Sequence, residues 1–206
     1  MRIIAGKAGG RRLKSPDTRG TRPATDRVRE AVFSSIGAWV EDSTVADLYA
    51  GSGSYGLEAL SRGASSAVFV ENGRKALQAL RANVKAVGLG GSIIESTVQA
   101  YLKRANHHFH LVFLDPPWPD PTEQMEENLA ALDRLLLPSA EVVVSRRHTD
   151  RPPVHPENWR VAADKRYGDT RIIRYEKVEN VDDGPTNGPA NGPANGPANS
   201  TVPGEL

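Results

Sequence analysis

The sequence contains no cysteine, which excludes disulfides and cysteine-ligated zinc sites. It also lacks an apolar run long enough to span a bilayer, and it does not open with a signal-peptide pattern. No Gly-x-Ser-x-Gly elbow supports a serine hydrolase. No His-Glu-x-x-His pattern accompanies His107, His108 and His110, so we interpret these histidines as a loop cluster rather than a metal site. We therefore expect a cytoplasmic protein that binds no metal.

Positive charge is concentrated at the amino-terminal end of the chain. The whole sequence carries 26 Lys and Arg against 25 Asp and Glu, a net charge of +1. Residues 1–30 hold nine basic residues and three acidic ones, whereas residues 179–206 hold four acidic residues and no Lys or Arg. A basic end on a nearly neutral chain favours contact with a polyanion such as RNA. A solvated basic hairpin is the alternative.

Composition and turn residues divide the chain into three parts. Residues 1–22 are predicted to form a basic β-hairpin for RNA recognition, with strands at 2–5 and 11–14. Residues 23–178 are predicted to form the main domain, beginning with a helix near Pro23 that Thr21 or Thr25 caps. Residues 179–206 contain a Gly-Pro-(Thr/Ala)-Asn repeat with almost nothing to bury, so we expect disorder there.

The main domain has the alternating pattern of a doubly wound α/β fold. Apolar runs predict seven strands, at 44–49, 67–70, 92–95, 111–114, 141–146, 159–164 and 170–176. Helical patterns fall at 56–62, 73–87, 97–105 and 123–136. Because strands that alternate with helices pair in parallel, we expect a mostly parallel sheet.

The tetrapeptide Asp115-Pro116-Pro117-Trp118 directly follows the apolar run 111–114. It should therefore stand at the carboxyl end of a parallel strand, the edge where open α/β sheets bind ligands. The two prolines end the strand and leave backbone carbonyls without partners. A carboxylate, a rigid carbonyl and an indole can together hold a planar group that carries an amine. A proline-rich turn with a packed Trp118 is the alternative.

A glycine-rich loop follows the first predicted strand. Residues 51–56 have the pattern Gly-x-Gly-x-x-Gly between a strand and a helix, which lets a nucleotide-like ligand approach the backbone closely. Glu71 ends the next predicted strand 20 positions after Gly51, where a carboxylate that binds ribose hydroxyls is expected. The alternative is a glycine-rich turn beside a solvated Glu71.

Together these motifs resemble the Rossmann-like methyltransferases that use S-adenosylmethionine. The resemblance narrows at the start of the chain, where RIIAGK at 2–7 and TRPATDRVRE at 21–30 are similar to the opening of the RsmD-like family. Residues 56–64 and 167–170 also fit its pattern, and the resemblance covers about residues 1–177. The family comprises bacterial guanine-N2 methyltransferases that act on 16S ribosomal RNA. It implies a seven-stranded sheet that ends in an antiparallel pair.

The resemblance also assigns roles to residues. It places in the cofactor site Asp47, Ala50, Gly51, Ser52, Gly53, Gly56, Glu71, Gln99 and Ala100. The family commonly has Asp where this chain has Gln99, and a Gln amide can accept from the adenine amine but carries no charge. The implied catalytic residues are Asp115, Pro116, Pro117 and Trp118. The basic side chains expected to contact RNA are Arg2, Lys7, Arg11, Arg12, Lys14, Arg19 and Arg22.

The implied reaction is methylation of the N2 amine of one guanine in 16S rRNA, presented either as naked RNA or in an assembled small subunit. We expect a monomer in which Trp118 stacks on a turned-out base while Asp115 and the Pro116 carbonyl accept from the amine. Arg146, Arg147 and Arg151 contact phosphates or form a solvated cluster. The alternatives are a methyltransferase of DNA adenine or cytosine amines, one that acts on protein glutamine, and a catalytically inactive RNA-binding or assembly protein.

Overall fold

The computed structural model describes residues 1–16 and 25–178. Its seven-stranded sheet has the order β3-β2-β1-β4-β5-β7-β6. The strands are β1 (Thr44–Leu48), β2 (Ser66–Glu71), β3 (Ser92–Glu95), β4 (Phe109–Leu114), β5 (Leu136–Arg147), β6 (Trp159–Tyr167) and β7 (Thr170–Lys177). β1 to β5 pair in parallel, and β7 is antiparallel to both β5 and β6. The expected α/β fold with its final antiparallel pair is confirmed.

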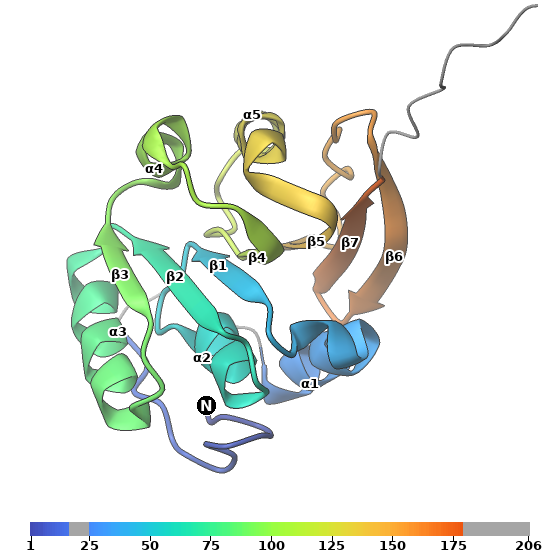
Figure 1. Ribbon diagram of the computed structural model, residues 1–206. Coiled ribbons are helices and arrows are strands. Elements are labelled where there is room, and N and C mark those ends of the chain that lie inside the picture. The colour runs from blue at the N-terminus through green and yellow to red at the C-terminus, as the bar shows by residue number, and fades with distance from the viewer. Residues whose placement is uncertain (17–24, 179–206) are drawn as a thin grey trace, which may run out of the picture.

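Helices cover both faces of the sheet (Figure 1). One face carries α1 (Asp26–Ile36), α2 (Ser54–Ser61) and α3 (Arg74–Val87), and the other carries α4 (Val98–Arg104) and α5 (Thr122–Leu132). Two short 3-10 helices lie at Gly37–Val40 and Asp133–Leu135. Alternate residues of one strand enter opposite layers of core, as Phe113 and Val112 of β4 do. Burial of each such side chain stabilises the fold by about 1.5–3 kcal/mol.

The first helix begins later than the sequence indicates. Thr25 caps α1, its hydroxyl accepting from the Val28 amide at 3.3 Å, so the first helical residue is Asp26 rather than one near Pro23. The buried face of α1 consists of Val28, Arg29, Val32, Phe33 and Ile36. Of the two caps that the sequence predicts, Thr25 is confirmed, and Thr21 and Pro23 lie outside the described residues.

The boundary between α5 and β5 also differs from the prediction. The helix expected at 123–136 ends at Leu132, and β5 begins at Leu136. Leu136 pairs with Phe109, after which the register shifts before Glu141 pairs with Leu111. Pro138 and Ser139, which has φ of 58°, lie within that irregularity. Pro138 and Ser139 interrupt the hydrogen-bonded ladder without ending the strand. Their residue types therefore suggest a loop in the sequence, although β5 continues through them.

Residues 1–16, which we call the N-terminal segment, pack against the body of the domain. The segment folds back on itself as a short hairpin, with an antiparallel bridge between Arg2 and Arg12. The Ile3 amide donates to the Arg11 carbonyl at 2.9 Å, and the Leu13 amide donates to the Met1 carbonyl at 3.1 Å. Other amides of the segment donate to α2, where the buried Glu58 carboxylate accepts from the Ile4 amide at 2.7 Å and from the Ala5 amide at 3.1 Å. Ile3 and Leu13 are buried in the same hydrophobic cluster as α1 and α2. The segment is thus part of the core on this face.

Some expectations concern residues outside the described ranges. They are the RNA contacts of Arg19 and Arg22, and the disorder of residues 179–206. Among the helices that are described, none combines the length and the apolar character needed to cross a membrane.

Candidate cofactor and substrate site

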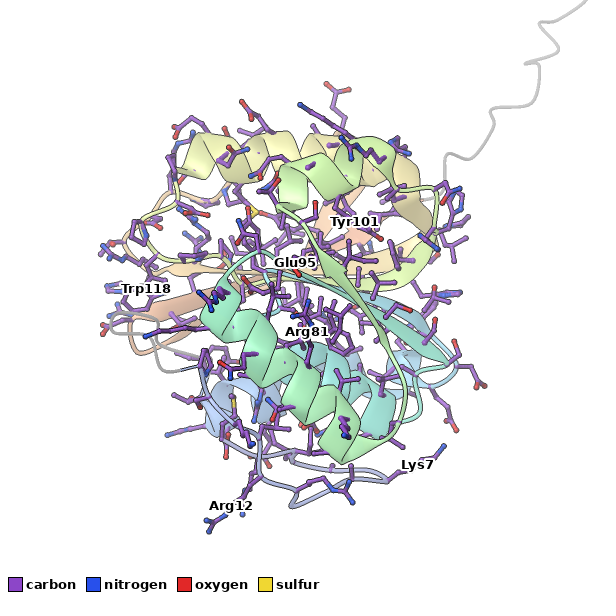
Figure 2. All side chains as sticks on the ribbon, turned by 90° about the vertical axis from the view of Figure 1, so that its left-hand side faces the viewer. Lys7, Arg12, Arg81, Glu95, Tyr101 and Trp118 are labelled. Atoms are coloured by element: carbon purple, nitrogen blue, oxygen red, sulfur yellow. The ribbon has the colours of Figure 1, made fainter. Side chains whose placement is uncertain are left out.

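The predicted cofactor and catalytic residues meet at one edge of the sheet. β1 pairs with both β2 and β4, and β2 pairs with β3, all in parallel. Glu71 ends β2, and the glycine loop, the start of α4 and the tetrapeptide at 115–118 follow β1, β3 and β4 respectively. Trp118 lies at this edge, whereas Lys7 and Arg12 point outward from the helical side formed with the N-terminal segment (Figure 2). Of the expected RNA contacts, Lys7 and Arg12 are therefore separate from the edge that holds the motifs.

Asp47 of β1 holds the end of the glycine loop through a hydrogen bond. The Gly56 amide donates to its carboxylate at 2.9 Å, and Asp47 is only 1% exposed. Burial raises the pKa of Asp47 to about 8, and the negative charges of Asp115 and Glu71 add to this rise, while the Gly56 hydrogen bond opposes it. A β-carbon on Gly56 would lie 2.4 Å from the Phe69 ring, so only glycine permits α2 to approach β2 this closely.

Glu71 holds the other side of the same loop. One of its carboxylate oxygens accepts from the Gly51 amide at 2.8 Å, and the other accepts from Asn72 and Gly73 at 2.9 and 2.6 Å. The Ala50 amide donates to the Val70 carbonyl at 2.9 Å, which fixes the start of the loop. A carboxylate has about four acceptor positions, so Glu71 keeps capacity for ribose hydroxyls beyond these three bonds.

Gln99 and Ala100 lie in the first turn of α4. Thr97 caps this helix by accepting from the Ala100 amide at 3.2 Å. The Gln99 side chain forms a hydrogen bond with the Tyr49 hydroxyl, which also accepts from Asn128 at 2.8 Å. Burial raises the pKa of Tyr49, which therefore stays neutral. Tyr49 and Asn128 were not predicted as site residues, although Tyr49 directly precedes the glycine loop.

The tetrapeptide begins with a partly buried acid. Burial raises the pKa of Asp115 to about 6, while a hydrogen bond from Ser145 on β5 opposes the rise. Pro116 is buried, Pro117 is exposed, and Trp118 is partly exposed. The Pro117 carbonyl accepts from the Asp120 amide at 3.0 Å, so the prolines lead into a tight turn.

Arginines of β5 hold this turn. Arg146 is 4% exposed, donates to the Asp120 carbonyl at 2.9 Å and pairs with Asp150 at 3.0 Å. The Arg147 guanidinium lies 5.0 Å from the centre of the Trp118 ring, in a cation–π contact. Arg151 instead forms ion pairs with Glu123 and Glu126 of α5. The three arginines, for which the sequence left phosphate contacts or a solvated cluster open, thus have three different environments.

A buried aromatic in the first turn of α2, Tyr55, contributes a further polar group. The Tyr55 ring stacks on Phe113 at 4.8 Å between centroids, and its hydroxyl has no hydrogen-bond partner among the described residues. Burial raises the pKa of Tyr55 well above its usual value, and Asp115 adds to the rise. Sequence reasoning treated Tyr55 as a variable position of the glycine pattern, so its proximity to Asp115 was missed.

The basic side chains of the N-terminal segment differ in their surroundings. Arg11 donates to the Ala86 and Val87 carbonyls at the end of α3, where a cation is favourable. Arg2 lies 3.7 Å from Asp26. The side chains of Lys7, Arg12 and Lys14 are exposed.

The histidines lie at the opposite edge of the sheet from the motifs. The Nδ1 atom of His110 accepts from the Thr44 amide at 3.1 Å, at the amino end of β1. The described residues contain no group of three or more His, Cys, Asp or Glu side chains placed to hold a metal ion.

Comparison with known proteins agrees with the motifs. A family model described as conserved hypothetical protein 95 matches residues 1–176. Ribosomal RNA small subunit methyltransferase D of Escherichia coli K12 is 33% identical over 178 residues, covering 86% of this chain and 90% of that protein. The protein of the same name from Haemophilus influenzae is 33% identical over 185 residues, covering 87% and 94%.

A solved structure shows the same architecture. A hypothetical protein from Thermus thermophilus superimposes with a TM-score of 0.74 at 29% identity, covering 87% of this chain and 99% of that one. Family model, sequence relatives and fold therefore point to one group of proteins. The chain belongs to the RsmD-like family, within the S-adenosylmethionine-dependent methyltransferases.

Proposed function

We propose that the protein methylates the N2 amine of a specific guanine in 16S ribosomal RNA, with S-adenosylmethionine as methyl donor. The observation that carries this proposal is the meeting of Asp115 and Trp118 with the glycine loop and Glu71 at one edge of the sheet. The names of the E. coli and H. influenzae relatives support ribosomal RNA as the substrate.

The residues around the glycine loop fit the cofactor. Glu71 retains acceptor capacity for ribose hydroxyls, and Gln99 lies in the first turn of α4, where its amide can accept from the adenine amine. Gly51 leaves the backbone open to close approach, since a β-carbon there would meet only the Tyr49 carbonyl oxygen at 3.9 Å. The Asp47 carboxylate, which accepts from the Gly56 amide, holds the end of the loop. When bound, the cofactor supplies an electrophilic methyl group on a sulfonium.

Asp115 is proposed to orient the attacking nitrogen. With a pKa of about 6 its carboxylate is ionised near neutral pH, so it can accept a hydrogen bond from the amine. The Pro116 carbonyl is proposed to accept the second one. Two acceptors fix the nitrogen relative to the methyl group, and such alignment can supply much of the rate. Asp115 then accepts the excess proton directly or through water.

Trp118 is proposed as the surface on which the turned-out guanine stacks. The indole is partly exposed, and the Arg147 guanidinium already occupies one of its faces. Stacking of a base on an aromatic side chain contributes about 1–3 kcal/mol. The base therefore either displaces Arg147 from the indole or stacks on the opposite face of the ring. If Arg147 is displaced, its guanidinium can bind a phosphate of the RNA.

The exposed basic side chains of the N-terminal segment are proposed to contact the RNA backbone. They are Lys7, Arg12 and Lys14, with Arg2 beside Asp26. Contacts to phosphates release counterions, so this affinity should fall with added salt. Ribosomal RNA or an assembled small subunit as partner places the activity in the cytoplasm, and a monomer suffices for the proposed site.

Tritiated-methyl transfer tests the proposal. Small subunits and naked 16S rRNA from a strain that lacks the gene are incubated with the protein and labelled S-adenosylmethionine, in parallel with DNA and with protein extracts. The expected label is in N2-methylguanosine from the RNA. Label in DNA adenine or cytosine, label in protein glutamine, or an absence of transfer to all substrates would refute the proposal.

A further inference from the structure

Asn83 is a buried polar residue on an apolar face of α3. It lies between Leu80 and Val87, which are also buried, and is itself only 2% exposed. Its amide nitrogen donates to the carbonyls of Lys14 and Ser52, both at 2.9 Å, and its oxygen accepts from the Lys14 amide at 2.8 Å. These bonds satisfy groups that would be costly to bury unpaired. One side chain thus joins the N-terminal segment to the glycine loop.

The glycine loop has little freedom to move independently of α3. A β-carbon on Gly53 would lie 2.6 Å from a methyl group of Leu80, which is one helical turn from Asn83. The Ser52 hydroxyl also donates to the sulfur of Met1 at 3.8 Å. The loop is therefore supported by α3 and by the N-terminal segment together.

The N-terminal segment has a second attachment that does not involve the loop. The Ser61 hydroxyl on α2 accepts from the Ala8 amide at 2.9 Å and donates to the Ala5 carbonyl at 2.5 Å. Ser61 is as buried as Asn83, at 1% exposed. It therefore offers a matched comparison, because it holds the same segment through similar bonds without a bond to the glycine loop.

We propose that Asn83 is a positioning residue that couples the two ligands, so that RNA bound along the N-terminal segment strengthens cofactor binding in the glycine loop. This inference rests on the proposed function, which assigns RNA to the segment. Lys14 supplies both an exposed cation for phosphate and the backbone groups that Asn83 holds. Fixing Lys14 by RNA restrains the Asn83 amide, and this amide restrains the Ser52 carbonyl. Ordering already achieved by one ligand lowers the cost of binding the other, and the effect is reciprocal.

Hydrogen exchange of the wild-type protein tests the connection without any substitution. S-adenosylhomocysteine added to RNA-free protein should slow amide exchange in residues 50–56 and also in residues 9–16, including the Lys14 amide. Protection that is confined to the glycine loop would overturn the coupling.

Titrations of S-adenosylhomocysteine with and without 16S rRNA measure the coupling directly. The RNA should tighten binding to the wild-type protein by about fivefold or more, the lower end of usual coupling between sites. Asn83→Ala should reduce this factor to near one. Asn83→Asp should do the same, because its carboxylate would face the two carbonyls that the amide served. Ser61→Ala should melt at a lower temperature yet keep the wild-type factor.

The outcomes separate this inference from the proposed function. A wild-type protein that does not bind 16S rRNA or small subunits contradicts the function itself. If the wild-type protein binds both ligands but RNA does not change its affinity for S-adenosylhomocysteine, only the coupling is overturned. The same holds if a folded Asn83→Ala variant shows the same RNA-induced gain in affinity as the wild type. Thermal unfolding identifies variants that do not fold. If Asn83→Ala is one of them, hydrogen exchange and the titrations of the wild-type protein still test the coupling.

Discussion

The glycine loop and the tetrapeptide loop end neighbouring strands, β1 and β4, but are held by different kinds of contact. Backbone amides of the glycine loop donate to the carboxylates of Asp47 and Glu71. The tetrapeptide loop is held by Arg146, which donates to the Asp120 carbonyl, and by Arg147 on Trp118. A guanidinium on a partly exposed indole contributes only about 0.5–2 kcal/mol and can move away. We therefore propose that the cofactor half, which is the glycine loop with Asp47 and Glu71, is preformed, whereas the substrate half, residues 115–120 with Arg146 and Arg147, can adjust to its ligand.

The largest effect is expected from deleting residues 1–14, which would remove a support of the cofactor half. Loss of the buried Ile3 and Leu13 should cost about 1.5–3 kcal/mol each, and the fully buried Glu58 would lose its two amide donors. We expect a broad urea transition and loss of cofactor binding. The matched variant Lys7→Ser/Arg12→Ser should stay folded and bind RNA less tightly, with a smaller dependence on salt. A deletion variant that unfolds cooperatively and binds cofactor would show the segment to be a separable arm.

Asp115→Asn should impair only the substrate half of the site, so that turnover falls while cofactor binding is kept. Loss of the acceptor and proton-receiving group should lower the single-turnover rate by about 100-fold or more, while cofactor affinity measured by calorimetry stays near the wild-type value. Asp120→Asn is the control, because Arg146 holds this residue through its backbone carbonyl. Near-normal turnover by Asp115→Asn would remove Asp115 from the chemistry.

Much of the site is predictable because its signals are local in sequence. Gly51, Gly53 and Gly56 stand between a strand and a helix, and Glu71 ends the next strand, so parallel pairing alone brings them together. The tetrapeptide after β4 is placed by the same rule. The antiparallel end followed from the family resemblance rather than from any local pattern, and the strand order was not predicted.

What the sequence could not predict depends on long-range partners. Asn83 lies within an apolar helical pattern, and nothing local indicates that its bonds go to Lys14 and Ser52. The sequence predicted that the N-terminal segment folds back on itself, but not that its Ile4 and Ala8 amides bond to Glu58 and Ser61 of α2. Arg146 and Arg147 adjoin the tetrapeptide only because β5 pairs with β4.

Gly56→Ala should impair the cofactor half of the site by lowering both stability and cofactor affinity. The added methyl group would lie 2.4 Å from the Phe69 ring, so α2 must shift, with an expected cost in stability of about 1–3 kcal/mol. Weaker binding of S-adenosylhomocysteine should accompany the lower urea midpoint. Gly88→Ala is the comparison, because it lies outside the site: its φ of 69° makes alanine strained although a methyl group meets nothing within 4 Å, so it should lower the urea midpoint without weakening cofactor binding. Unchanged cofactor affinity in Gly56→Ala would contradict a preformed loop.

Trp118→Ala should lower turnover more than Trp118→Phe, because a phenyl ring retains part of the stacking surface. The expected loss for alanine corresponds to about 1–3 kcal/mol of base binding. Arg147→Ala should have a smaller effect, since its contact with the indole is one that the substrate can replace. Steady-state kinetics with 16S rRNA measure all three variants. Equal rates for the alanine and phenylalanine variants of Trp118 would rule out stacking.

The smallest effect concerns the pH dependence of stability. The pKa of Asp115 is raised from 3.8 to about 6 in the folded protein, so the folded state binds this proton more tightly than the unfolded state. Its cost to stability should therefore grow as pH rises from about 4 to about 6 and stay constant above. Urea unfolding of wild type and Asp115→Asn across this range should show the difference growing in favour of the variant. Parallel curves would contradict the burial of this carboxyl group.

Nucleoside mass spectrometry of 16S rRNA from a strain lacking the gene tests the central claim most directly. The account predicts that one N2-methylguanosine is missing and that it returns with the wild-type protein. It should not return with Asp115→Asn, which keeps the cofactor half intact. An unchanged N2-methylguanosine content in the deletion strain, or equal restoration by Asp115→Asn, would contradict it.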